Sequence, residues 1–156
     1  LENETDAPGE VVSRVVMTAD PSMFKVSVPV TLPMSMKANG HVDCAKNAQI
    51  TNDSIAPVEI KCIVITGLSG WKIADWNEGN SRYALNSDIV AISINGVGCQ
   101  DGYVDVSNDD AFGPIPAVKG ENTLALEYAG NVSMVTTAIT EAMNIATVTF
   151  VIGWAD

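Results

Sequence analysis

The residues in this chain that are best suited to chemistry are oxygen donors gathered in one acidic stretch, DVSNDDAFG. The stretch supplies four side chains with carboxylate or amide oxygens: Asp105, Asn108, Asp109 and Asp110. Ca²⁺ prefers hard oxygen ligands of this kind. The spacing does not match an EF-hand loop, so two interpretations stand, a calcium site and a solvated acidic turn.

Histidine-based chemistry has little support in the sequence. His41 is the only histidine, it follows the Asn39-Gly40 turn signal, and no Gly-x-Ser-x-Gly elbow occurs. Neither a Ser-His-Asp triad nor a Cys-His nucleophile pair is therefore expected. No Cys-x-x-Cys or Cys/His spacing indicates zinc. We predict a protein that is not an enzyme and has no cofactor, unless the acidic stretch binds Ca²⁺.

Three aromatic residues offer a different kind of site. Trp71 and Trp76 flank the sequence KIAD, and Tyr83 follows shortly after. Aromatic faces of this kind can stack on sugar rings, and they also fill protein cores and sheet edges. The core interpretation is favoured, and the ligand-binding interpretation stays as the alternative.

The elements that must position these residues are strands. Alternation of apolar and polar residues, the period of a strand, predicts strands over 25–32, 41–45, 48–52, 57–66, 71–76, 88–95, 103–106, 123–128 and 145–154. Residues 133–143 fit a short helix or a further strand. Clusters of Gly, Asn, Asp and Pro separate the runs. We predict an all-β chain, one antiparallel β-sandwich domain over 1–156 of the Ig-like or jelly-roll-like kind, with about seven to nine strands and at most one short helix.

The strand pattern also makes a prediction about the cysteines. If 52–56 is a turn between paired strands, even-numbered residues of both strands face the core. Cys44 then falls opposite Cys62, at a Cβ separation of about 4.5–5.5 Å, which is near disulfide geometry. We predict a Cys44–Cys62 disulfide. Pairing of either residue with Cys99, or three buried free thiols, are the alternatives.

An N-terminal segment, GEVVSRVVMTA, is apolar on both sides of Arg14. As an extended strand it can complete its own sheet, or it can add to the open edge of a neighbouring copy. Low lysine content favours the second reading, because charged edge residues normally block such pairing. The predicted donor strand lies within 1–19, and its apolar residues are Val11, Val12, Val15, Val16 and Met17.

Charge limits the partners. The chain has 8 basic and 19 acidic residues, a net charge of −11. Nucleic-acid binding needs clustered basic residues, and an anionic membrane surface attracts them too, so neither partner is expected. No apolar run reaches the roughly 18 residues of a membrane-spanning helix. The sequence starts at Leu1 rather than Met, which indicates a signal peptide that has been removed or a chain trimmed at this end, and we expect a secreted protein.

Residues 25–76 resemble a module of secreted and surface proteins of Gram-positive bacteria. The resemblance is carried by a V-P-x-x-L-P strand at 28–33, the Asn39-Gly40 hairpin, the pattern N-A-x-I-x-N-x-S-x-x-P-V at 47–58 and a Gly-Trp corner at 70–71. More distantly, the chain is similar to fibre-forming matrix proteins of the TasA/camelysin type. The resemblance implies a β-sandwich, an extracellular or cell-surface location and assembly by passing a terminal strand to a neighbour. It brings no catalytic residues, and the cysteines at 44 and 62 depart from the pattern.

Two functions follow as expectations. The first is a self-associating structural subunit of an extracellular filament or biofilm matrix, assembled by strand donation from 9–19. The second is an adhesin module that binds a glycan or a surface receptor through the three aromatic residues and a calcium-bearing acidic loop.

Overall fold

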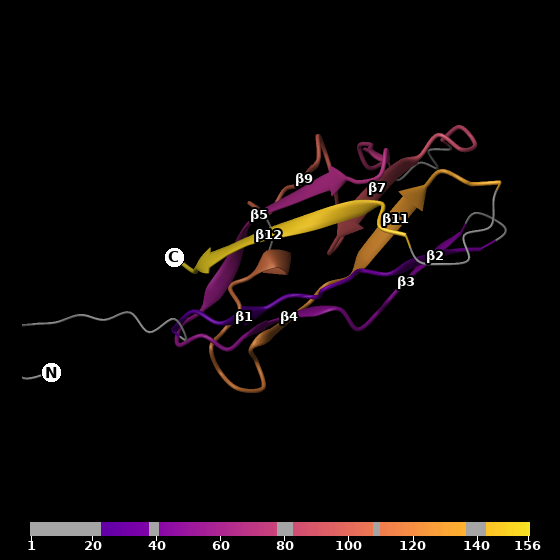
Figure 1. Ribbon diagram of the computed structural model, residues 1–156. Coiled ribbons are helices and arrows are strands. Elements are labelled where there is room, and N and C mark those ends of the chain that lie inside the picture. Colours follow the sequence, from indigo (N-terminus) through magenta and orange to yellow (C-terminus); the bar gives the residue numbers. More distant parts are fainter. Residues whose placement is uncertain (1–22, 38–40, 78–82, 108–109, 137–142) are drawn as a thin grey trace, which may run out of the picture.

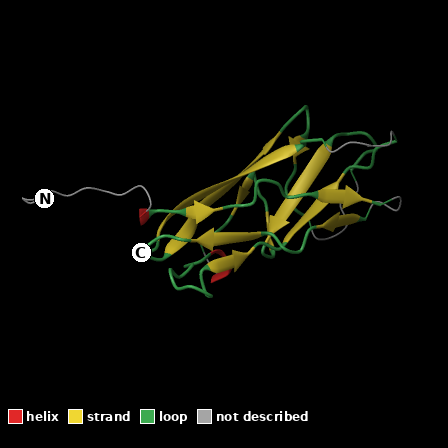
Figure 2. Ribbon diagram, turned by 60° about the horizontal axis from the view of Figure 1, so that its bottom comes forward, coloured by secondary structure: helices red, strands yellow, loops and turns green. Residues whose placement is uncertain are grey.

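Strands make up nearly all of the regular structure in the computed structural model, which describes residues 23–37, 41–77, 83–107, 110–136 and 143–156. Figure 2 shows this dominance of strands, with helix confined to short turns. The elements are β1 (Val26–Ser27), β2 (Met34–Met36), β3 (Val42–Cys44), β4 (Gln49–Asn52), β5 (Val58–Gly67), β6 (Lys72–Ile73), β7 (Ile89–Ile94), β8 (Val97–Gly98), β9 (Tyr103–Val104), a 3₁₀ helix η2 (Asp110–Phe112), β10 (Thr123–Ala125), β11 (Tyr128–Val132) and β12 (Ala146–Trp154).

The strands form packed, mainly antiparallel sheets, which confirms the predicted all-β sandwich. One sheet has the order β1-β4-β10, a second has β11-β7-β6 with β8 paired to β7, and a third has β12-β5-β9. Strands β2 and β3 form a separate hairpin. The β6–β7 pair is parallel and every other pair is antiparallel. In Figure 1, β5 and β12 lie side by side above the layer that contains β1 and β4.

The core lies between these sheets and is built from β-branched and aromatic side chains. Its fully buried large side chains come from strands β4, β5 and β7 and from two residues in the connections between strands. They are Ile50, Val58, Ile63, Val90, Ile94, Ile115 and Leu126. Burial of a Val, Leu or Ile side chain contributes about 1.5–3 kcal/mol, so this layer stabilises the sandwich.

The described chain has more strands than the seven to nine expected, because long alternating runs are divided. The run at 123–128 breaks at Leu126, which is 2% exposed and donates its backbone N–H to the Ala48 carbonyl at 2.9 Å. Before this residue β10 pairs with β4, and after it β11 pairs with β7. The chain therefore passes from one sheet to another within a single alternating run.

A β-bulge at Lys61 corrects the predicted facing of β5. The register pairs Val151 with Cys62 but Ile152 with Ile60, so Lys61 is an extra residue in β5. Such a residue reverses which side of the strand faces the core. Val58 and Ile60 are buried before the bulge, whereas Ile63 and Ile65 are buried after it. The prediction that all even-numbered residues face the core is wrong beyond Lys61.

The expected hairpin between 48–52 and 57–66 is also wrong. Strand β4 pairs with β1 and β10, while β5 pairs with β12 and β9, so the two runs lie in different sheets. Asn52 explains the crossing. It is 1% exposed, its Nδ2 donates to the carbonyls of Ala56 and Ile115, and its Oδ1 accepts the Ser54 N–H at 2.9 Å. These bonds hold 52–56 as a corner between layers instead of a turn within one sheet.

The Asn39-Gly40 signal correctly predicts a hairpin. Strands β2 and β3 pair antiparallel, and the Lys37 N–H donates to the His41 carbonyl at 2.8 Å beside the turn. The turn residues 38–40 themselves lie outside the described residues. The run at 25–32 forms only the two-residue strand β1, and Val30 is 99% exposed, so the predicted strand does not extend over the whole run.

Residues 133–143 were expected to form either a short helix or a further strand. Residues 133–136 are described outside any strand or helix, and most of the remaining stretch to 143 lies outside the described residues. In the part of the chain that the structure describes, no helix combines the length and apolarity needed to cross a membrane.

Candidate functional site: the open edge of strand β12

Strand β12 is the longest exposed sheet edge among the described residues. It pairs with β5 on one side over nine residues, and within the described chain no strand pairs with its other side. Its sequence, ATVTFVIGW, contains no charged residue and no proline. Native edge strands are usually protected by charges, proline, bulges or shortness. Here the bulge at Lys61 is in the partner strand, and the edge itself carries none of the other protections.

The apolar row of β12 is incompletely covered. Val148, Phe150 and Ile152 belong to the row that packs against the core, yet none of them is fully buried. Their neighbours on β5, Ile63 and Ile65, are 0% and 4% exposed. The apolar side chains are therefore fully buried on β5 but only partly buried on β12, the last strand of the sheet. An added strand would cover this row and pair the free N–H and C=O groups at once.

The N-terminal part of the described chain meets the end of this edge. The ring of Phe24 lies edge-on against Trp154, with centroids 5.1 Å apart and planes at 89°. Both rings are about two-fifths exposed, at 40% and 42%. Residues 1–22 therefore join the described structure at Met23, beside the last residue of β12. In Figure 1, β12 ends at the side of the molecule where β1 begins.

This junction is fixed by hydrogen bonds to the 52–56 corner. The Lys25 N–H donates to Ser54 Oγ at 2.8 Å, and Ser54 Oγ donates back to the Lys25 carbonyl at 3.2 Å. The Asp53 N–H donates to the same carbonyl, and the Ile55 N–H donates to the Met23 carbonyl. The point at which the N-terminal segment leaves the sandwich is thus set by the same corner that Asn52 organises.

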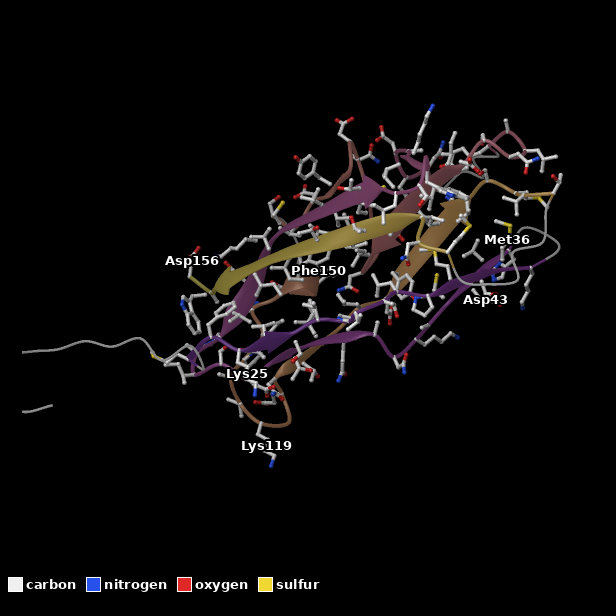
Figure 3. All side chains as sticks on the ribbon, in the orientation of Figure 1. Lys25, Met36, Asp43, Lys119, Phe150 and Asp156 are labelled. Atoms are coloured by element: carbon white, nitrogen blue, oxygen red, sulfur yellow. The ribbon has the colours of Figure 1, made fainter. Side chains whose placement is uncertain are left out.

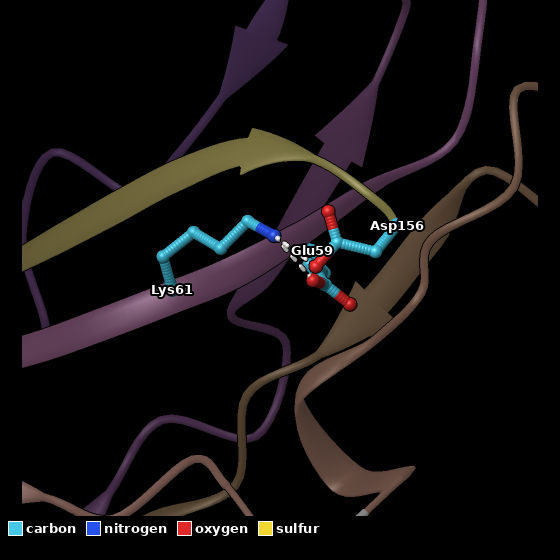
Figure 4. A network of polar contacts seen from close by, with 3 residues as sticks. All are labelled: Glu59, Lys61 and Asp156. Atoms are coloured by element: carbon cyan, nitrogen blue, oxygen red, sulfur yellow. Dashed lines mark hydrogen bonds and ion pairs between the residues drawn. The ribbon is translucent and has the colours of Figure 1, made fainter.

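A polar cluster lies at the same end of β12, next to the bulge. Figure 4 shows the Lys61 ammonium directed at the carboxylates of Glu59 and Asp156. The hydrogen bond that the Lys61 ammonium donates to the Glu59 carboxylate is the main reason that the pKa of Lys61 is raised. These residues border a groove of about 650 Å³, whose other lining residues are Ile60, Val106, Ser107, Asp110, Phe112, Gly113 and Pro114. The groove is mixed in polarity, and its described lining residues form no catalytic constellation.

The predicted calcium ligands are only partly described. Asp105 Oδ1 accepts both the N–H and the Oγ–H of Ser107, and these bonds lower the pKa of Asp105. Asp110 begins η2 and lines the groove, whereas Asn108 and Asp109 lie outside the described residues. Among the described residues, no group of three or more His, Cys, Asp or Glu side chains is placed to hold a metal ion. Calcium binding stays a prediction.

The three aromatic residues do not form an exposed platform. Trp71 is 7% exposed and belongs to the core. Trp76 is half-buried over Gly98, where a Cβ atom would lie 2.3 Å from its side chain. Tyr83 is half-buried, and burial raises the pKa of its hydroxyl. This placement agrees with the core interpretation, and it removes Trp71 as a sugar-stacking surface.

The predicted Cys44–Cys62 disulfide is not formed, and all three cysteines are free. Cys44 lies on β3 opposite Met34, and Cys62 lies on β5 opposite Val151. The prediction failed because it required a β4–β5 hairpin. Cys99 is fully buried, donates to the Ala74 carbonyl and accepts the Ile92 N–H.

The predicted donor residues Val11, Val12, Val15, Val16 and Met17 lie outside the described residues. The acceptor edge was missed at the sequence level, although its signal is present as a charge-free, β-branched run at 145–154. In comparisons with protein-family models, curated proteins and solved structures, nothing matches this chain.

Proposed function

We propose that this protein is a structural subunit of an extracellular filament, in which an N-terminal strand of one copy adds to the β12 edge of the next. The observation that carries the proposal is the nine-residue, charge-free edge with a half-covered apolar row. The resemblance of residues 25–76 to modules of secreted Gram-positive surface proteins supports the extracellular setting.

The sequence of 9–19 supplies what the edge lacks. In an extended strand, side chains alternate between faces. Val11, Val15 and Met17 then share one face, and Val12 and Arg14 share the other with Val16 and Thr18. Because Arg14 is charged, the second face is expected to point to solvent. The first face supplies the apolar side chains that cover Val148, Phe150 and Ile152 of the acceptor copy.

Geometry separates donation to a neighbour from pairing within one copy. Residue 23 joins the structure at the Trp154 end of β12. If 9–19 lay along β12 of its own copy, it would run toward that end, in the direction in which β12 itself runs. It would thus add a parallel strand to a sheet whose other pairs are antiparallel. Addition to a second copy carries no such constraint and propagates head to tail.

Parity provides a matched pair of variants for the test. The triple variant V11T/V15T/M17T makes the inward face polar, and V12T/V16T makes a similar change on the outward face. Electron microscopy and sedimentation of the purified full chain should show filaments for the wild type and for V12T/V16T. The triple variant should stay monomeric at the same concentration, with an unfolding midpoint equal to that of unassembled wild type.

Three results count against strand donation. Filaments that persist in the triple variant would show that 9–19 is not the connecting strand. A triple variant whose monomer loses stability would place the strand in its own sheet. A wild-type chain that stays monomeric at every concentration tested would remove the filament role altogether.

A further inference from the structure

Three sulfur-containing side chains share one face of the β2–β3 hairpin. Met34 stands directly opposite Cys44 in the ladder, and directly paired residues point to the same side of an antiparallel pair. Met36 lies two residues further along β2 and therefore on the same face. All three side chains are half-buried, whereas Asp43 on the opposite face is exposed.

Two of these sulfurs meet at one residue of the neighbouring strand. The Sδ atom of Met34 lies 2.7 Å from the position that a Cβ atom on Gly130 would occupy. The Cys44 sulfur lies beside the Gly130 backbone. Because Gly130 has no side chain, the edge of β11 leaves room for both sulfur atoms. Any larger residue at 130 would displace Met34.

Charged side chains of this hairpin pair with one another on its opposite face. His41 Nε2 and Lys37 Nζ contact the Asp43 carboxylate at 3.1 Å and 3.2 Å, on the solvent side of the hairpin. Figure 3 shows Met36 and Asp43 at the end of the molecule far from Lys25 and Asp156. The inward face of the hairpin thus presents a thiol and two thioethers beside Val42, and soft d¹⁰ ions such as Cu(I) prefer these sulfur ligands more strongly than Ca²⁺ or Mg²⁺ does.

We propose that Met34, Met36 and Cys44 form a three-coordinate binding site for one soft monovalent ion of the Cu(I) class. On binding, the Cys44 S–H bond breaks, its proton goes to solvent, and a sulfur–metal bond forms. The ion enters and stays as Cu(I), so no oxidant or reductant takes part. The net charge of −11 favours the approach of any cation. This site is separate from β12 and does not depend on the filament proposal.

Methionine also fills irregular gaps as an apolar side chain, so the test has to distinguish metal binding by sulfur from packing. Leucine has nearly the same volume and is well tolerated in place of methionine, but it offers no ligand atom. The variant M34L/M36L therefore preserves packing and removes two ligands. Its matched control is M23L, at the other end of the molecule beside Phe24. Cys62 is the control for Cys44, since it is equally half-buried and its ladder partner is Val151.

The test uses the full chain labelled with ¹³C at the methionine methyl groups and titrated with Ag(I), an air-stable stand-in for Cu(I). Binding should saturate at one equivalent and shift only the Met34 and Met36 methyl signals, which the single Leu variants assign. One proton should be released per ion. Competition with a chromophoric Cu(I) chelator should show at least a tenfold weaker affinity for M34L/M36L and for C44A. The variants M23L and C62A should bind like the wild type.

Other results overturn the proposal. Equal Cu(I) affinity in the wild type and M34L/M36L would show that the thioethers only fill space. Loss of binding in C62A, with binding kept in C44A, would show that the ion binds at β5 and not at the hairpin. If C44A does not fold, M34L/M36L decides the matter alone, because its substitutions keep the hairpin's volume.

Discussion

The ring of Phe24 stands perpendicular to that of Trp154, and the two centroids are 5.1 Å apart. This contact joins the first described segment of the chain to the last residue of β12. It ties the exit point of the N-terminal segment to the sheet edge that the segment is proposed to complete in the next copy.

The first prediction concerns the energy of this contact. A double-mutant cycle with F24A and W154A in the unassembled chain should give a coupling of about 0.5–1.5 kcal/mol, the range for an aromatic pair beyond simple burial. Urea unfolding of the wild type, both single variants and the double variant measures it. Strictly additive effects would show that the rings are neighbours without mutual stabilisation.

The second prediction concerns the buried amide of Asn52. The substitution N52A should lower the free energy of unfolding by at least about 2 kcal/mol, since it removes the hydrogen bonds to the Ala56 and Ile115 carbonyls and leaves the buried Ser54 N–H without its acceptor. Thermal or urea unfolding measures the loss. N131A is the control, because the bond that the Asn131 side chain makes to a described residue is an exposed, 3.4 Å bond to the Asn77 carbonyl. Equal effects of the two substitutions would contradict this role for the corner.

The third prediction concerns Tyr128, whose hydroxyl joins the two ends of the β2–β3 hairpin to β11. It donates to the Pro33 carbonyl and accepts the Ala45 N–H at 3.1 Å. Y128F should cost about 1–2 kcal/mol and increase hydrogen exchange at Ala45. Y103F, at a residue that is 54% exposed, should change stability by less than about 0.5 kcal/mol. An unprotected Ala45 amide in the wild type would contradict the bond.

The fourth prediction concerns acid. The hydrogen bond from Lys37 holds the pKa of Asp43 below its ordinary value, and Ser107 does the same for Asp105. A depressed folded-state pKa stabilises the protein above the unfolded pKa and loses that contribution as pH falls through the folded value. Stability should therefore fall below about pH 4. Carboxyl NMR titration should show the pKa of Asp43 rising in K37M while that of Asp105 stays constant. An unchanged Asp43 titration in K37M would rule out Lys37 as the cause.

The fifth prediction concerns the thiols. Denatured protein should show three reactive thiols, because no disulfide is formed. In the native state Cys99 should react slowest, since it is 0% exposed and its sulfur is hydrogen-bonded. Cys44 should also be slow, as burial raises the pKa of its thiol and reduces the thiolate fraction. Mass spectrometry after timed alkylation gives the order. A count of one reactive thiol in the denatured protein would show that a disulfide is present.

Local patterns were sufficient to predict where most strands lie. The alternating runs at 48–52, 57–66 and 88–95 correspond closely to β4, β5 and β7. Strand β5 is the central strand of its sheet, between β12 and β9. Strand positions depend on the alternation of apolar and polar side chains, and this alternation can be recognised from neighbouring residues alone.

Pairing and facing could not be predicted in the same way. Lys61 resembles any exposed strand residue, yet as an inserted bulge it reverses the parity that placed Cys62 inward. Asn52 resembles a turn residue, and its role depends on carbonyls more than sixty positions away. The edge of β12 is open because no described strand pairs with its outer side. That fact depends on the pairing of the whole sheet and cannot be seen in any single run of the sequence.

The pairing of β12 with β5 also orders events during synthesis. Ribosomes release β5 well before β12, and domains begin folding from the part already released. Until Ala146–Trp154 emerges, the long side of β5 that β12 later occupies is unpaired. The surface proposed to accept a neighbour does not exist in the partly made chain, so polymerisation by this route has to wait for β12. In the proposed assembly, synthesis of β12 would thereby precede polymerisation.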